Sequence, residues 1–387
     1  MHQATSAVQN PLPASGDEAP RPPLLGIAGN VSHQGAGPFT FDNPNLTLCI
    51  VEFDDQGCLF RDDQMQTVEG SLKRLAGRDA NIFVFVHGWK HNAKSDDSNL
   101  QSFTKILIHL AELEPADNPV PILGLFIGWR GLSLHGLGLE NLTFWDRKQA
   151  GVRVALGSVR ELFGRLRHFR AERKRAHGSS LLAIIGHSFG GMVVYSALAQ
   201  SLIEAAAMPL VHNEPSFADL VLLVNPAFEA ARYLPIQRFV EQNTHLKAAA
   251  PPIFVSVTSR ADWATRFAFP LGCLSWLLTE ATRGKRQAQA LINTMGHISW
   301  MKTHTLSKKP GTVSDTVLAP SGVRSTNPFW VVQTTRGVMK DHNDIFNETI
   351  VGFVRELLIA HLQQVAAARH RVSPPARPIE PPVTTGV

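Results

Sequence analysis

A serine flanked by glycines is the feature of this sequence best suited to chemistry. It lies in the segment 186–190, Gly-His-Ser-Phe-Gly, which matches the pattern G-x-S-x-G and directly follows an apolar run. A strand that becomes a helix within a few residues strains the serine backbone, and only glycine leaves room on either side. The helix expected from Met192 would turn its positive end toward charge developing at the serine. We therefore expect Ser188 to be an exposed nucleophile; its alternative role is to cap that helix.

Predicted strands and helices alternate along the chain on both sides of this turn. Apolar runs predict strands at 46–53, 81–88, 121–127, 181–186, 219–224, 252–257 and 329–334. Apolar residues at helical spacing predict helices, listed as 71–75, 98–113, 145–175, 192–203 and 345–362. A turn at 54–57 and a return strand to Phe60 predict an opening hairpin, whereas 263–327 contains no clear strand. This order predicts an α/β fold with a mostly parallel central sheet and helices on both faces.

The composition is compatible with one large α/β domain. The chain has 387 residues, and a hydrophobic content of 44% supports a substantial core. Residues 1–25 are expected to form a disordered lead, 26–370 the domain, and 371–387 a Pro-rich disordered tail. Neither a Sec-type signal nor a membrane-spanning segment is visible, and the three cysteines are too few for a disulfide framework. A cytoplasmic location is therefore expected, with export by a signal-less route left open.

The order of these parts resembles the α/β-hydrolase superfamily over residues 45–362. The shared order is a hairpin start, a strand ending in His-Gly, a nucleophile turn, further strands, a late histidine and a closing helix. His87-Gly88-Trp89, the strand ending in Gly128-Trp129, and Trp145-Asp146 are similar to a largely uncharacterised bacterial branch. Where that branch has Trp-Pro-Ser, this chain has Arg130 and Gly131 after the tryptophan. The resemblance implies an α/β-hydrolase fold with a cap-like insertion at 263–327, before the last strand.

A serine nucleophile needs a histidine base. His342 follows the last predicted strand and precedes the last predicted helix, where the superfamily places its base. His297, in a Gly-His dipeptide, is the main rival, followed by His304 and His91. The choice rests on the position of His342 after the strand. It predicts that replacing His297 by alanine changes kcat little.

The base in turn needs a carboxylate that orients it. In the superfamily this acid follows one of the two strands after the nucleophile turn. The first of these strands ends in Asn225-Pro226, which offers no carboxylate, and the second is followed by Asp262. Asp262 is therefore the expected acid, and a helix cap is its alternative role. The alternative candidates for the acid are Glu229, Asp341 and Asp344.

Two backbone N–H groups are expected to stabilise the oxyanion formed during acyl transfer. One is the N–H of Phe189, directly after the nucleophile. The resemblance assigns the other to Trp89, in the loop after the His-Gly strand. The alternative for His87-Gly88 is a plain turn that ends a buried strand.

Two further segments suggest partners. The insertion at 263–327 begins with many large apolar residues, which could line an acyl pocket or pack against the domain. The expected helix 145–175 contains a basic cluster that could contact anionic lipid or nucleic acid: Arg160, Arg165, Arg167, Arg170, Arg173, Lys174 and Arg175. Because Glu161 and Glu172 dilute this cluster, we expect a solvated helix end and no nucleic-acid partner, with peripheral membrane contact as the alternative.

The sequence thus predicts a serine hydrolase that cleaves small-molecule or lipid carboxylic esters through Ser188, His342 and Asp262. No metal or organic cofactor is expected, because H-E-x-x-H, G-x-G-x-x-G after a strand, and G-x-x-x-x-G-K-[ST] are all missing from the sequence. The same three residues could instead serve a thioesterase, an acyltransferase or an amidase. A catalytically silent module that binds a membrane or a partner is a third alternative.

Overall fold

The computed structural model describes residues 37–88, 91, 93–129, 143–207, 217–242, 251–274, 279–312, 314–321 and 327–372, with the backbone alone at 143–147 and 365–372. The expected disordered lead 1–25 lies outside these residues. So does the expected tail 371–387, apart from residues 371 and 372, which end the last helix.

A single ten-stranded sheet organises the protein, in the order β1-β2-β4-β3-β5-β6-β7-β10-β8-β9. Its strands are β1 (Phe39–Thr40), β2 (Leu46–Phe53), β3 (Asn81–Val86), β4 (Ile122–Trp129), β5 (Leu181–His187), β6 (Leu220–Val224), β7 (Phe254–Ser259), β8 (His304–Lys308), β9 (Thr316–Pro320) and β10 (Phe329–Thr334). Neighbouring strands run parallel except at the two edges, where β1 pairs with β2 and β8 with β9 in antiparallel fashion. The protein is therefore a mixed α/β protein with a mostly parallel sheet.

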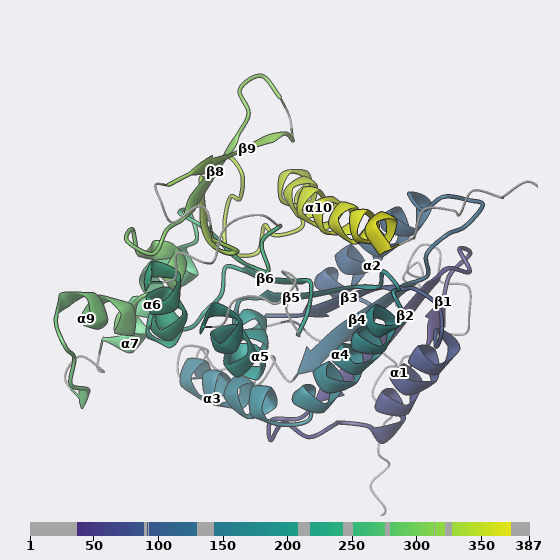
Figure 1. Ribbon diagram of the computed structural model, residues 1–387. Helices are drawn as coiled ribbons and strands as arrows, with labels where there is room; N and C mark the ends of the chain where they lie inside the picture. The colour runs from purple at the N-terminus through teal and green to yellow at the C-terminus, as the bar shows by residue number, and fades with distance from the viewer. Residues whose placement is uncertain are drawn as a thin grey trace, which may run out of the picture.

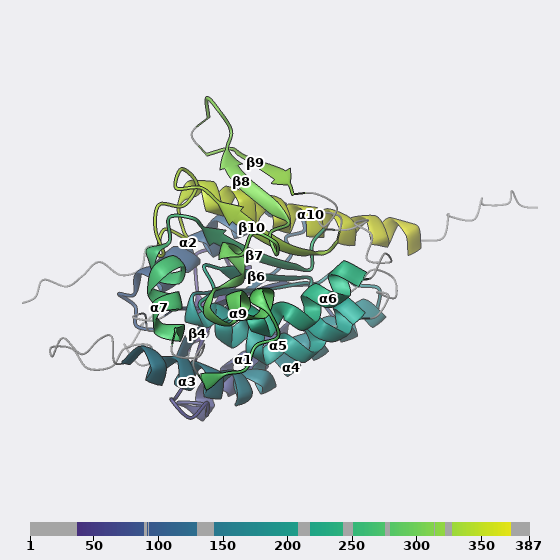
Figure 2. The same ribbon diagram turned by 90° about the vertical axis from the view of Figure 1, so that its left-hand side faces the viewer.

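Helices cover both faces of this sheet (Figures 1 and 2). One face packs against α2 (Ser98–Glu112) and α10 (Glu348–Val372). The other packs against α1 (Asp62–Arg74), α3 (Thr143–Leu156), α4 (Val159–Arg175), α5 (Phe189–Ala207) and α6 (Leu234–Gln242). Successive side chains of β3 point to opposite faces of the sheet and so contribute to the hydrophobic cores on both faces. Ile82 and Val84 lie in one hydrophobic cluster, and Phe83 and Phe85 lie in the other. A strand buried on both faces has the apolar run that the sequence displays.

Several element boundaries differ from those predicted. The expected return strand to Phe60 is reduced to one antiparallel bridge between Phe53 and Leu59, and β1 is the antiparallel partner of β2 instead. The short helix expected at 71–75 is the end of the longer α1. The long helix expected at 145–175 is divided into α3 and α4, because the Ser158 N–H donates to the carbonyl of Gly57 rather than continuing the helix.

The segment 263–327, predicted as a cap-like insertion with no clear strand, contains both helices and strands. It begins with one π-helical turn, η3 (Ala264–Ala268), followed by α7 (Phe269–Cys273), α9 (Lys285–Ile292) and the short turn η4 (Met295–His297). It then contributes β8 and β9 to the sheet edge, where β8 pairs with β10. The sequence of β8 does not stand out as a strand because Leu306 is the only fully buried apolar side chain in His304–Lys308. Trp276, Leu277 and Leu278, counted in its apolar start, lie outside the described residues.

Helix α5 is the one helix of the described residues that has the length and apolar composition to cross a bilayer. It packs inside the molecule: Met192, Val193, Leu198 and Leu202 are all buried in the larger hydrophobic cluster. Its apolar character is accounted for by this position against the sheet.

The basic cluster of α4 is largely paired with acidic side chains. Ion pairs join Arg165 to Glu161 and Glu69, Arg173 to Asp79, and both Arg170 and Lys174 to Asp219. Burial alone would raise the pKa of Asp219, but Arg170, Lys174 and the Leu182 N–H outweigh it and lower that pKa to about 2. Arg170 and Asp219 are both buried, so this pair joins α4 to the start of β6 in the protein interior.

Replacing Arg170 by alanine should lower the free energy of unfolding by about 3–5 kcal/mol, because the buried Asp219 carboxylate loses its main counter-charge. The contribution should be present above about pH 4 and disappear as the pH falls toward 2, since the pKa of Asp219 is lower in the folded protein than in the unfolded chain. Urea unfolding across this pH range measures both effects. The matched control is Arg165→Ala on the same helix, whose exposed pairs contribute at most about 1 kcal/mol. Equal losses in the two variants would contradict the prediction.

Candidate active site

Ser188 lies in the sharp turn between β5 and α5. Its φ angle is 55°, in the left-handed region that side chains other than glycine rarely adopt. Glycine is required on both sides: a Cβ at Gly186 would lie 2.7 Å from the Gly190 carbonyl oxygen, and a Cβ at Gly190 would lie 2.2 Å from the Val86 carbonyl oxygen. The turn therefore holds its strained serine because neighbouring backbones approach closely.

Ser188 is buried rather than exposed as expected, with only 4% of its surface accessible. Two neighbours account for this burial. Gly88 packs against it so closely that an added Cβ would lie 2.9 Å from the Ser188 Cβ. His342 lies against its hydroxyl, in the loop between β10 and α10.

A continuous chain of hydrogen bonds connects the serine, histidine and aspartate singled out in the sequence. Ser188 Oγ lies 2.8 Å from His342 Nε2, and His342 Nδ1 lies 2.8 Å from Asp262 Oδ2. These residues come from three separate places: the turn after β5, the loop after β10 and the loop after β7. A histidine held in this way can take the serine proton through one nitrogen while the carboxylate fixes its other nitrogen.

Asp262 makes the contacts that both of its predicted roles require. Its Oδ1 accepts the Thr265 backbone N–H at 3.1 Å, which is a cap interaction, while its Oδ2 accepts from His342. Burial alone would raise the pKa of Asp262, but the hydrogen bonds from His342 and Thr265 outweigh it and lower the pKa. The fully buried carboxylate is therefore ionised at neutral pH.

The loop that carries His342 is fastened by side chains that the sequence did not reveal. The carbonyl oxygen of His342 accepts two hydrogen bonds, from His187 Nε2 at 3.0 Å and from Asn225 Nδ2 at 2.9 Å. Asn225 Oδ1 also accepts the Ser259 N–H, which links β6 to β7. Burial, and secondly the nearby His342, holds the pKa of His187 well below its ordinary value, so neutral His187 donates its one ring proton here. In the sequence, the only indication of this role for Asn225 was its position at the end of a predicted strand.

The rival histidine, His297, lies on the far side of Asp262 and does not contact Ser188. Its Nε2 is 2.9 Å from Thr265 Oγ1, which in turn donates to Asp262 Oδ2 at 2.5 Å. Because the Thr265 proton points to the carboxylate, Thr265 Oγ1 accepts the His297 N–H. Burial lowers the pKa of His297 to about 4, so it is neutral at pH 7 and donates one proton. His297 and Thr265 thus extend the hydrogen-bond chain behind the acid.

Replacing Thr265 by valine should lower kcat roughly 10-fold with little change in KM, because Asp262 loses a charge-assisted hydrogen bond but keeps His342. Steady-state kinetics on a short p-nitrophenyl ester measures the effect. Thr265→Ser is the matched control, since it retains the hydroxyl and should preserve kcat. If kcat were unaltered in Thr265→Val, the hydroxyl of Thr265 would have no effect on catalysis and the residue would contribute only packing.

The other candidates for the base and the acid form hydrogen bonds or ion pairs with other residues. Glu229 forms a buried ion pair with Lys148 and a second pair with Arg232. Asp341 and Asp344 accept backbone N–H groups within the His342 loop. Among the other candidate bases, His91 contacts Asp97 and His304 contacts Thr303.

Of the two residues expected to donate to the oxyanion, the structure describes only one. Phe189 is the first residue of α5, directly after Ser188. Trp89 lies outside the described residues, and so do Arg130 and Gly131. The turn before residue 89 is held firmly: His87 Nδ1 donates to the Gly88 carbonyl oxygen at 2.7 Å, and its Nε2 accepts the Trp129 backbone N–H at 3.1 Å. The Trp129 indole N–H donates to the His87 carbonyl oxygen at 2.9 Å.

Comparisons with known proteins add little to this geometry. No family model matches the chain, and no curated protein matches its sequence. An uncharacterised protein from Bacillus cereus ATCC 10987 is similar in structure, with 11% identity, a TM-score of 0.32, and coverage of 79% of this chain and 71% of that chain. Phospholipase PlaB from Legionella pneumophila, solved with thio-NAD, has 11% identity and a TM-score of 0.31, covering 76% of this chain and 62% of the phospholipase. This chain therefore spans less than two thirds of the phospholipase, and TM-scores this low carry no inference about activity.

Proposed function

We propose that this protein is a serine hydrolase of the α/β-hydrolase type that cleaves carboxylic esters. The observation that carries the proposal is the hydrogen-bond chain Ser188–His342–Asp262, with both links at 2.8 Å. The strained backbone of Ser188 at the start of α5 supports it further. A serine that only capped the helix would need neither the histidine nor the buried carboxylate.

In the proposed reaction, Ser188 Oγ attacks the ester carbonyl carbon while His342 Nε2 takes the hydroxyl proton. Collapse of the tetrahedral intermediate breaks the bond to the alcohol, which leaves with the proton returned by His342. Water then attacks the acyl-enzyme, again giving a proton to His342, and the carboxylic acid leaves as Ser188 recovers its proton. Asp262 holds the imidazole in one tautomer and stabilises the imidazolium without taking its proton. The backbone N–H of Phe189 is the proposed oxyanion donor, with Trp89 as the second.

An apolar acyl group is the substrate feature best supported by the segment after Asp262. Thr265, Phe269 and Cys273 form the buried side of η3 and α7. The opposite side exposes large apolar side chains at helical spacing: Trp263 (68%), Phe267 (53%), Leu271 (74%) and Leu274 (52%). Exposed large apolar side chains on one side of a helical segment are typical of surfaces that contact apolar ligands. This supports a lipid-like ester over a polar one.

A fluorophosphonate probe tests the proposed nucleophile directly. We expect the wild-type protein to gain one covalent label, detected by intact mass, and Ser188→Ala to gain none. Ser196→Ala is the matched control: Ser196 lies two turns along α5, and its hydroxyl contacts Arg232. Labelling that persists in Ser188→Ala would place the nucleophile elsewhere. A panel of esters, thioesters and amides with matched acyl groups then separates ester hydrolysis from the thioesterase and amidase alternatives.

A further inference from the structure

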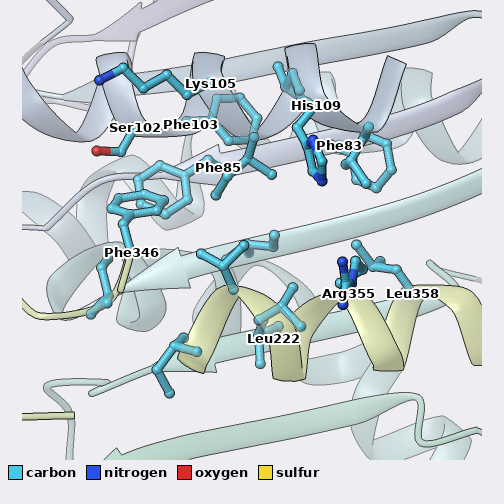
Figure 3. A pocket seen from close by; sticks show the side chains of 18 of the residues that line it. Phe83, Phe85, Ser102, Phe103, Lys105, His109, Leu222, Phe346, Arg355 and Leu358 are labelled. Carbon is cyan, nitrogen blue, oxygen red and sulfur yellow. The ribbon is translucent and has the colours of Figure 1, made fainter. Parts of the chain in front are cut away.

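A cavity lies on the sheet face that carries α2 and α10, and Ser188 is not part of its lining (Figure 3). Its volume is about 460 Å³, within the range of small-molecule sites. The floor is formed by β3, β5 and β6, and the walls by the two helices. Its lining is predominantly aromatic and aliphatic, including Phe83, Phe85, Phe103, Leu222 and Val354.

The cavity reaches the middle of the sheet. Ile185 in β5 pairs with Phe85 on one side and Leu222 on the other, so it occupies a central position. It is nevertheless partly exposed, whereas its four predecessors in β5 are buried. Central strands of parallel sheets are normally covered on both faces, and leaving apolar surface in water costs about 25 cal/mol per Å². An apolar ligand between α2 and α10 would remove this cost.

Basic side chains stand at the rim of the cavity. Figure 3 shows His109 on α2 facing Arg355 on α10 at one end of the cavity, with Lys105 on α2 at the other end. Lys105 and Arg355 are exposed, and neither forms an ion pair with any residue that the structure describes. Glu348 is the one acidic side chain of the lining. His109 lies beside the Glu112 carboxylate. The cavity therefore combines an apolar interior with one exposed cationic side chain at each end, Lys105 and Arg355.

We propose that this cavity binds a single-chain fatty acid, with the acyl chain over Ile185 between Phe85 and Leu222 and the carboxylate near Arg355. The apolar interior fits the chain, and Arg355 complements the anionic head group. The site would be distinct from Ser188, and it does not depend on the proposed hydrolase activity. Ile345 and Phe346 also line the cavity, so the ligand would contact the loop that carries His342.

Fluorescence of cis-parinaric acid, displaced by oleate, tests the proposal on the full-length protein. We expect one molecule bound per chain. Val354→Trp, which fills the cavity from α10, should weaken binding at least about tenfold. Ile359→Trp is the matched control, because Ile359 lies on the same helix, is 42% exposed and does not line the cavity. Equal binding by these two variants, or no binding by the wild type, would overturn the proposal.

Head-group recognition and the location of the ligand need separate measurements. Arg355→Glu should weaken oleate about tenfold while leaving oleyl alcohol unaffected, whereas Lys105→Glu at the other end of the cavity should leave both unaffected. Both side chains are exposed, so these changes do not threaten folding. Equal effects on acid and alcohol would exclude anion recognition. Protein labelled at Ser188 by the fluorophosphonate should still bind the probe; loss of binding on labelling would locate the ligand at Ser188 and overturn the proposal. Should Ser188 not label, the proposed hydrolase fails while the comparison of Val354→Trp with Ile359→Trp still decides this site.

Discussion

Replacing His342 by alanine should lower kcat by about 10⁴- to 10⁶-fold, the scale on which members of a catalytic triad act as one unit. His342 Nε2 lies 2.8 Å from Ser188 Oγ, and no other described histidine ring contacts that hydroxyl. Without this ring, the Ser188 proton has no acceptor during attack. Stopped-flow and steady-state kinetics on a short p-nitrophenyl ester measure kcat and KM. The loss is expected in kcat rather than KM, because His342 acts on the Ser188 proton.

His297→Ala is the control that separates the two histidines. Its Nε2 contacts Thr265 rather than Ser188, so the loss in kcat should be no larger than that of Thr265→Val. His304→Ala, near the sheet edge, should leave kcat unaltered, since its ring contacts Thr303. A large loss in His297→Ala together with a nearly normal His342→Ala would refute the proposed base.

The second large effect is expected for Asp262→Asn, with a decrease in kcat of about 10⁴-fold. The amide nitrogen of asparagine cannot accept the His342 Nδ1–H, and an imidazole in the other tautomer would present a proton to Ser188 instead of a lone pair. Asparagine retains an oxygen that can accept the Thr265 N–H, so the cap interaction can survive. The expected result is therefore a loss of activity with little loss of thermal stability.

Asp262→Ala is the companion variant because it removes the two hydrogen bonds from Thr265 as well as the one from His342. It should lower kcat to a similar extent and also lower the melting temperature, since the cap is lost as well. The two variants measured by kinetics and thermal unfolding thus distinguish the two oxygens of one carboxylate. An Asp262→Asn variant with normal kcat would reduce Asp262 to a helix cap.

The residues proposed for catalysis could be chosen from sequence because each follows a strongly apolar strand. Such strands are evident from composition alone, and the ends of parallel strands meet at one edge of a sheet. Ser188 carried the additional signal of its flanking glycines. The order of strands in the central sheet therefore brings together side chains that lie 74 and 80 positions apart along the chain.

The supporting contacts could not be predicted in the same way. Thr265, His297 and Asn225 act through hydrogen bonds made only when loops after β6, β7 and α9 approach one another, and no local pattern marks such contacts. The last two strands at one end of the sheet, β8 and the edge strand β9, were missed for a related reason. An edge strand is covered less than a central one, so its sequence needs less apolar character.

The anchoring of the His342 carbonyl has a consequence for how this site can diversify. Its two donors, His187 and Asn225, belong to the strand that ends in Ser188 and to the strand beside it. The spacing between base and nucleophile is thus set by residues that are neighbours in space, and the length of the segment 335–341 does not determine it. A change in that segment that keeps these two hydrogen bonds would leave the separation of the reacting atoms unaltered, while Val338 and Met339 within it stay fixed by burial in the core.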